Sequence, residues 1–329
     1  MTGAPVRPAR PARPAPLEWA GLLPVDKPGG MTSHDVVSRA RRVLGTRAIG
    51  HLGTLDPGAS GLLVLAVGPA TRCAQVWQGG TKTYAATVRF GVVTASQDLD
   101  GEVLETREVT ADEAALRRAS DAMLGDSAQV PPMVSALKHK GERLYDIARR
   151  GEVVEREPRP ITVHAWEWTR VALPEADCVV RCSGGTYVRT LAHDLGASLG
   201  CGAALASLRR LASEPFRVED ACPWDAFVPG DHDALIARWG VTLDRALGVL
   251  PEVRLDAAQA DALGHGQFVE AALDDAAAAA IGAGPRTVAL RELSGRALAL
   301  GELVRESDGR VLARPNVVFP WAVREGRAA

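Results

Sequence analysis

The feature that most constrains this chain is a glycine-rich loop, residues 50–61, that presents one carboxylate just before an apolar stretch. The loop places Asp56 and Pro57 among four glycines, and the apolar residues 62–67 that follow are typical of a buried strand. Glycine lets a ligand approach the main chain closely, and proline keeps a turn rigid. The sequence therefore predicts that Asp56 is presented to a substrate; the alternative is a hairpin loop in which Asp56 caps a turn. A phosphate-binding loop is disfavoured, because Ala59 stands where that pattern needs lysine.

Two segments near this loop carry patterns of their own. Residues 21–35 predict a strand, a turn at Lys27-Pro28 and a helix that begins near Ser33. Residues 82–91, KTYAATVRFG, alternate in the manner of a strand and contain Tyr84. Both segments therefore pair an expected strand with a polar or aromatic group that chemistry could use.

Two later segments complete the set. Residues 130–151 contain the pattern P-x-x-S-A-x-K, which ends at Lys138, and then L-Y-x-x-A-R-x-G. Further on, the pattern G-T-Y-x-R-T holds Tyr187 and Arg189, and the sequence Leu208-Arg209-Arg210 follows. Because one short motif can arise by chance, the joint occurrence and order of these segments carry the argument.

Together these segments resemble the signatures of pseudouridine synthases, specifically the tRNA pseudouridine synthase B family, over about residues 21–216. The resemblance implies an α/β fold of the α+β type, with a large mixed, mainly antiparallel sheet and a central active-site cleft. It also implies isomerisation of the T-loop uridine, tRNA position 55, to pseudouridine. The loop departs from the family pattern at Leu52, usually small and polar, and at Gly58, usually larger and apolar. Neither departure removes a catalytic group.

The resemblance assigns the central chemistry to Asp56, Arg189 and Tyr84. The reaction breaks the N-glycosidic bond, turns the base and joins its C5 to the same sugar carbon, so we expect neither a metal nor a cofactor. Asp56 would be the nucleophile, attacking either the sugar or C6 of the base. Arg189 would be its paired cation. Tyr84 would stack on the extruded base or relay a proton; its alternative is a half-buried core tyrosine.

Five further residues are candidates for substrate binding. His51 would enter the RNA fold near the flipped nucleotide, or instead bond the backbone of its loop. Tyr187 would line the Arg189 pocket if that segment is extended, because residues two apart share a face of a strand; otherwise it supports Arg189 in the core. Leu208 matches a family pocket position, with core packing as its alternative. Lys27 and Lys138 would either stabilise loops or contact phosphates.

Composition sets broad limits on the 329-residue chain. Its hydrophobic content of 47% allows a large core and more than one domain. The chain has no uninterrupted apolar run long enough to span a membrane, and residues 1–17 predict a disordered, basic tail rather than a signal peptide. The five cysteines lack paired spacing and predict buried, reduced thiols. We expect a cytoplasmic protein.

A net charge of −2 is not typical of an RNA-binding protein, which normally has a basic surface. Its distribution is more informative, because basic residues cluster in three groups beside the candidate segments: Arg39, Arg41, Arg42 and Arg47; Lys138, Lys140, Arg143, Arg149 and Arg150; Arg209 and Arg210. Each group alone is typical of a solvated helix face. Together they predict one basic groove for RNA.

The sequence also predicts the main elements. Helices are expected over residues 33–44, 111–124 and 188–199, the first two after Ser or Thr caps. Strands are expected over 62–67, 84–90 and 178–182, and a hairpin turn at Asp100-Gly101.

A composition shift near Leu250-Pro251 predicts a boundary between a catalytic domain, residues 18–250, and a second domain, residues 251–324. Short strands at 287–293, 297–305 and 311–314 fit a small β-barrel, which the resemblance identifies as a PUA-like RNA-binding domain. The alanine run 271–280 predicts a helix or loop without assigned function.

The expected partner is the T-arm of tRNA, bound by a monomer that needs no protein partner. Two alternatives stay open: a pseudouridine synthase that acts on another RNA, including guide-dependent enzymes, and a nonenzymatic protein that binds or folds tRNA. A carboxylate-nucleophile hydrolase would need a second acid or a metal to activate water, and the sequence shows neither beside Asp56.

Overall fold

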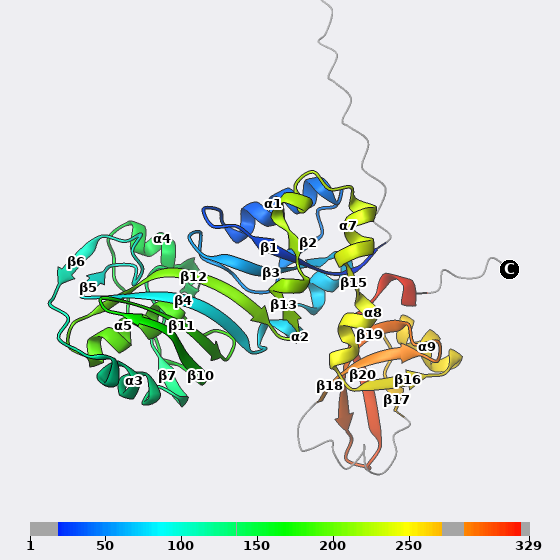
Figure 1. Cartoon of the computed structure of the whole chain (residues 1–329). Coiled ribbons are helices and arrows are strands. Elements are labelled where there is room, and N and C mark those ends of the chain that lie inside the picture. The colour runs from blue at the N-terminus through cyan, green and yellow to red at the C-terminus, as the bar shows by residue number, and fades with distance from the viewer. Residues whose placement is uncertain (1–18, 136, 272–285, 324–329) are drawn as a thin grey trace, which may run out of the picture.

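The computed structural model describes residues 19–135, 137–271 and 286–323. A large mixed sheet forms the body of the molecule, and a smaller sheet lies at one end of it (Figure 1). The expected tail, residues 1–17, and nearly all of the alanine run, from residue 272 onward, lie outside the described residues.

The large sheet has eleven strands. Its main path follows the order β14 (Cys222–Pro223), β1 (Gly21–Lys27), β3 (Ser60–Val67), β12 (Ala203–Ser213), β4 (Lys82–Phe90), β11 (Glu175–Cys182), β10 (Arg159–Ala172) and β7 (Gly125–Gln129). Three short strands pair beside this path: β2 (Ile49–His51), β13 (Phe216–Arg217) and β15 (Val241–Thr242). Most neighbours are antiparallel, whereas β12 pairs with β3 and β14 pairs with β1 in parallel. The predicted mixed, mainly antiparallel sheet is confirmed.

Two hairpins, β5 (Val92–Thr94) with β6 (Val103–Thr106) and β8 (Lys138–His139) with β9 (Glu142–Arg143), lie outside this sheet. The main helices are α1 (Ser33–Val43), α3 (Glu113–Asp121), α5 (Val188–Ser198), α7 (His232–Trp239) and α9 (Ala257–Gly264). Shorter helical turns are α2 (Gln75–Gln78), α4 (Leu144–Arg149), α6 (Trp224–Phe227), α8 (Leu243–Ala246), η1 (Gly68–Cys73), η2 (Val218–Asp220), η3 (Leu247–Val249) and η4 (Pro320–Ala322).

The predicted helices are present, with one corrected start. Helix α1 begins after Thr32, whose hydroxyl accepts from the Asp35 amide while the Asp35 carboxylate accepts from the Thr32 amide. Helix α3 begins at Glu113 rather than at residue 111, because the carboxylate of Asp112 caps it by accepting from the Ala115 amide. The predicted threonine cap is therefore wrong, and α3 ends before the expected residue 124.

Each face of the large sheet has its own core. One face packs with α1, α3, α5 and α7 around Leu63, Val88 and Leu191. The opposite face of β1 and β3 contributes Leu22, Leu62 and their neighbours to a second core with α2 and α8. Helices α1, α3, α5 and α7 therefore cover one face of the large sheet. On the opposite face, α2, α8 and the smaller sheet cover β1 and β3.

The smaller sheet follows the order β16 (Glu252–Leu255), β18 (Arg286–Glu292), β19 (Ala297–Arg305), β20 (Val311–Val318) and β17 (Val269–Glu270). It is a curled half-barrel sheet with its own core against α9, and β20 extends beyond the expected residue 314. Ala289, Leu300 and Phe319 also join the second core of the body. The small sheet is thus packed onto the body through shared apolar contacts.

All five cysteines are buried and unpaired, as expected. Among the described residues, no helix is both long enough and apolar enough to cross a membrane.

Candidate active site

The loop that carries Asp56 leaves the sheet where its two halves meet. It connects β2 to β3, and β3 touches β12 through only two residue pairs, Ser60 with Arg209 and Gly61 with Arg210. Gly61 has φ +100°, and a Cβ there would lie 2.3 Å from the carbonyl oxygen of Arg210. Glycine is therefore required at this crossing, both for the backbone conformation and for the close approach.

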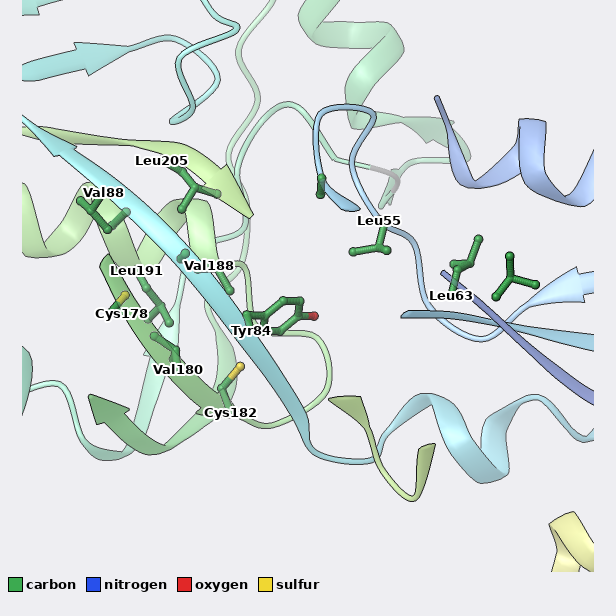
Figure 2. Packing of buried hydrophobic residues seen from close by; sticks show 14 of the residues in the cluster. Leu55, Leu63, Tyr84, Val88, Cys178, Val180, Cys182, Val188, Leu191 and Leu205 are labelled. Atoms are coloured by element: carbon green, nitrogen blue, oxygen red, sulfur yellow. The ribbon is translucent and has the colours of Figure 1, made fainter. Parts of the chain in front are cut away.

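Three buried side chains hold the loop in place. The Ser33 hydroxyl donates to the Leu55 carbonyl at 3.0 Å and accepts from the Leu55 amide at 2.9 Å. The Lys27 ammonium donates to Pro28, Met31 and Pro57 carbonyls at 2.9, 2.7 and 3.4 Å. The Arg210 guanidinium donates to the carbonyls of Gly53 and Thr54. Since the Leu55 side chain is also buried (Figure 2), the loop is anchored on both sides of Asp56.

Asp56 forms a two-pronged ion pair with Arg189. The Arg189 Nε donates to Oδ2 at 2.9 Å and Nη2 donates to Oδ1 at 3.2 Å. The Arg189 side chain is 3% exposed and that of Asp56 is 41% exposed. The buried guanidinium is therefore a fixed support beneath an accessible carboxylate. Two carbonyls, of Ser96 and Val134, accept its other hydrogens at 2.8 Å each.

The ion pair lies between two neighbouring pockets. The first, of about 280 Å³, is lined by residues from five segments of the sequence, including Asp56, Tyr84, Tyr187, Arg189 and Leu208. The second, of about 410 Å³, lies on the other side of Asp56 and includes Asp98, Tyr145 and Leu208. A third pocket, of about 650 Å³, lies around Phe90 and Arg107 and contains none of the predicted site residues. The first pocket, although smaller, is therefore the candidate active site.

Tyr84 and Tyr187 shape the first pocket in different ways. The Tyr84 ring projects from β4 with its hydroxyl toward the side of the Leu55 loop (Figure 2), and burial raises the pKa of this phenol, which therefore stays neutral. Burial also raises the pKa of Tyr187. Tyr187 is the N-cap of α5, and the Gln129 amide bonds both its N–H and its carbonyl.

The comparisons with known proteins agree with this geometry. A family model described as TruB family pseudouridylate synthase, N-terminal domain, matches residues 41–188, and the tRNA pseudouridylate synthase B C-terminal domain model matches residues 189–228. A tRNA pseudouridine synthase B of Burkholderia mallei (strain NCTC 10247) is 48% identical over 247 residues, covering 75% of this chain and 82% of the relative. The chain belongs to the tRNA pseudouridine synthase B family. It is therefore an isomerase of the pseudouridine synthase class.

Other relatives of this synthase support the same assignment. A tRNA pseudouridine synthase B of Opitutus terrae is 53% identical over 210 residues, covering 64% of this chain and 87% of the relative. A chain in the crystal structure of a Cbf5-Nop10-Gar1 complex is 25% identical, with a TM-score of 0.68, and covers 93% of this chain and 87% of that chain. A chain of an archaeal box H/ACA sRNP Nop10-Cbf5 complex, 23% identical with a TM-score of 0.69 over 94% of this chain and 89% of that chain, shares the fold.

The condition set for Tyr187, an extended segment, is not met in this synthase. The predicted helix is present instead: α5 begins at Val188, and Arg189 lies in its first turn. Both side chains nevertheless line the same pocket. The start of the helix, rather than the two-residue alternation of a strand, directs both side chains into this pocket.

The remaining predicted residues fall in three places. Lys27 is buried and bonded to carbonyls, so it stabilises the loop. His51 lies on β2 and is not among the residues that line either pocket; burial, Arg210 and His34 lower its pKa. Lys138 lies on β8, and its side chain lies outside what the structure describes.

Several arginines of the three basic groups are bound within the protein. Arg210 is buried, Arg209 is paired with Asp26 at 2.7 Å, and Arg150 is paired with Glu142 and Glu152. Arg39 donates to the Val228 carbonyl. Many of these arginines therefore stabilise the fold, which their sequence positions could not reveal.

Sequence reasoning missed two polar residues of the site. The Asp98 carboxylate lies 3.6 Å from the Arg189 guanidinium, and Asp98 bridges to Leu205 of β12, so the guanidinium contacts two carboxylates. Lys82, two residues before Tyr84, lines the pocket with it. The i, i+2 spacing on a predicted strand was the available signal for Lys82; Asp98 was read only as part of a turn. Within the described residues, no three His, Cys, Asp or Glu side chains are grouped to hold a metal ion.

Proposed function

We propose that this synthase converts the T-loop uridine of tRNA, position 55, to pseudouridine with Asp56 as the nucleophile and without a metal or cofactor. The observation that carries the proposal is the accessible Asp56 carboxylate, held by buried Arg189 at the mouth of a pocket that contains Tyr84 and Leu208. The sequence identity to enzymes called tRNA pseudouridine synthase B supports the substrate.

The pocket supports a reaction on an extruded base. A uracil in a stacked loop hides its reactive atoms, and an apolar or aromatic slot offsets the cost of unstacking it. Tyr84 from β4 and Leu208 from β12 stand on adjacent strands of the pocket wall. We assign them to the two faces of the base and Tyr187 to the pocket edge.

Arg189 supports the nucleophile in two ways. Its positive charge lies against the Asp56 carboxylate, and its two-pronged contact fixes the direction of that carboxylate. Since four hydrogen bonds hold the guanidinium in place, Asp56 is oriented before substrate arrives, which lowers the entropy cost of attack.

The rest of the chain is assigned to RNA binding. We assign residues 18–250 to catalysis and the sheet within 251–324 to a PUA-like RNA contact, with His51 and Lys138 beside the bound T-arm. We propose that the enzyme acts on tRNA in the cytoplasm as a monomer that needs no protein partner.

The test is incubation of an unmodified tRNA transcript with the wild type and with Asp56→Asn, without metal or cofactor, followed by mapping of pseudouridine at single-nucleotide resolution. We expect product at the T-loop uridine only with the wild type, because an amide cannot act as the nucleophile, and equal tRNA affinity for both. Asp121→Asn, at the exposed end of α3, is the matched control and keeps full activity. Product from Asp56→Asn would refute the mechanism, and product at another site would move the substrate.

A further inference from the structure

Two buried cations of the first pocket have no role in the ion pair at Asp56. Lys82 is 5% exposed and Arg210 is 2% exposed. They are neighbours, because a Cβ on Gly53 would lie 3.6 Å from Arg210 Nη1 and 3.8 Å from Lys82 Cε. Both line the same pocket as Asp56, Tyr84 and Leu208.

Main-chain carbonyls, rather than carboxylates, bind these cations. The Lys82 ammonium donates to the carbonyls of Gln78 at 2.8 Å and Gly80 at 2.6 Å. Arg210 donates to Leu62, Gly53 and Thr54 carbonyls. Within the described part of the chain, neither cation forms an ion pair with a carboxylate; Asp56 and Asp98, the acids of the site, contact Arg189.

An ammonium has three hydrogens to donate, so two carbonyls leave one N–H of Lys82 without an acceptor. Burying two like charges side by side without a counter-charge is expensive, and a neutral side chain could fill the same space. For Arg210, the hydrogen bonds that anchor the Asp56 loop offset the cost of burying its charge. Among the described residues, the Lys82 ammonium donates to the carbonyls of Gln78 and Gly80, which shortly precede its own strand. These bonds do not anchor the Asp56 loop, so the charge of Lys82 needs a different explanation.

We propose that Lys82, supported by the charge of Arg210, is a catalytic residue that stabilises the negative charge that develops on the uracil ring during isomerisation. The spare N–H would donate to a carbonyl oxygen of the base. This inference rests on the proposed function, since it needs the uracil to occupy the pocket with Tyr84 and Leu208.

The chemistry requires such a group on either route. If the C1′–N1 bond breaks first, its electron pair stays on the base and spreads to O2 and O4, while C1′ is captured by the Asp56 carboxylate. If Asp56 instead adds to C6, the C5–C6 pair moves onto C5 and O4. On the first route C5 then attacks C1′ and releases the Asp56 carboxylate. On the second route C5 attacks C1′ as the C1′–N1 bond breaks with its electron pair left on N1, and later loss of the C5 proton expels Asp56 from C6. On both routes C5 loses its proton and N1 gains one. A fixed donor aimed at the developing oxyanion lowers the barrier without changing the ground state.

The first test compares wild type, Lys82→Met and Lys82→Arg under single-turnover conditions with saturating enzyme and tRNA transcript. Removal of one oxyanion donor costs roughly 10²-fold in rate, so we expect a loss of that order in Lys82→Met. The dissociation constant of tRNA and its salt dependence should stay unchanged. Lys82→Arg should recover part of the rate, and thermal unfolding of each variant verifies folding.

Three outcomes would overturn the proposal. Weaker tRNA binding with a salt slope reduced by about one and an unchanged saturated rate would make Lys82 a phosphate contact. Equal rates in wild type and Lys82→Met would leave it a purely structural residue. A lower melting temperature that accounts for the whole activity loss would do the same. If the wild type forms no product on tRNA, the proposed function itself fails.

The second test uses pH. Burial, together with neighbouring Arg210, lowers the pKa of Lys82 to about 8, so the ammonium is lost as pH rises through that value. The facing groups do not titrate in this window: burial raises the pKa of Cys182 on β11 to about 11 and that of Tyr84 on β4, and Arg210 on β12 stays charged. The ratio of the wild-type rate to the Lys82→Met rate should therefore fall about tenfold between roughly pH 7 and pH 9. A constant ratio would refute the charged role.

Discussion

Arg189→Lys tests whether the shape of the guanidinium, and not only its charge, supports Asp56. Arginine here makes four hydrogen bonds, two to Asp56 at 2.9 and 3.2 Å and one each to Ser96 and Val134 at 2.8 Å. A lysine carries three hydrogens on a single atom and cannot reach four acceptors in a planar arrangement. The substitution therefore keeps the charge but loses at least one contact to the carboxylate.

The loss can be estimated from these contacts. A hydrogen bond to a charged group contributes about 1.5 to 3 kcal/mol. Because the Asp56 side chain is 41% exposed, solvent screens the interaction and the low end of the range applies, about 1.5 to 2 kcal/mol. At about 1.4 kcal/mol per tenfold change, turnover should fall roughly 10- to 30-fold. Stability should fall by about 1 to 3 kcal/mol, because a buried carbonyl loses its donor.

The assay is single-turnover pseudouridine formation with saturating enzyme, alongside urea unfolding. Arg170→Lys is the matched control, because Arg170 pairs with Asp177 at 2.6 Å but is 49% exposed, and solvent screens exposed ion pairs. We expect Arg170→Lys to match the wild type in rate. An Arg189→Lys enzyme with a wild-type rate would show that charge alone supports Asp56, and our geometric argument would be refuted.

Two further predictions concern how the site is held. Ser33→Ala should lower the free energy of unfolding by about 2 kcal/mol or more, because the buried N–H and carbonyl of Leu55 lose their partner; urea unfolding with Ser38→Ala on the same helix as control measures it, and equal midpoints would contradict the anchoring role. Truncation after Leu250 should lower the urea midpoint, since Leu22 and Leu62 lose Ala289, Leu300 and Phe319 from their shared core. A truncated chain as stable as the full one would show that the small sheet is an independent unit.

Much of the site could be predicted because its chemistry is local in the sequence. The Asp56 loop needs glycines and a proline within a few residues, and the apolar run behind it gives a strand whatever the rest of the fold does. Helices α1 and α5 were both predicted, the first with a Ser or Thr cap before it. Structural features that depend only on residues nearby in the sequence can therefore be predicted from the sequence.

The errors arose where the partner is distant in the sequence. Nothing near Arg210 shows that it bonds carbonyls 148 to 157 residues away, so it was grouped with surface cations. Asp98 lies beside Arg189 only because the loop after β5 folds back against α5. For α3, the competition between Thr110 and Asp112 as caps was decided by which side chain faces the free amides of the first turn.

The spatial placement of charges, which the sequence does not show, explains how a chain with a net charge of −2 can bind an anionic substrate. Some exposed acids pair with exposed arginines, as in Arg107 with Glu105 and Arg117 with Glu113, and the charges of each such pair cancel at a distance. Around the pocket, Lys27, Lys82 and Arg210 are bound to carbonyls, which neutralise no charge. Low-dielectric walls strengthen the field of such buried cations inside the cleft. The potential that a substrate meets is therefore set by which charges lack a counter-charge, and the pocket is positive although the protein is not.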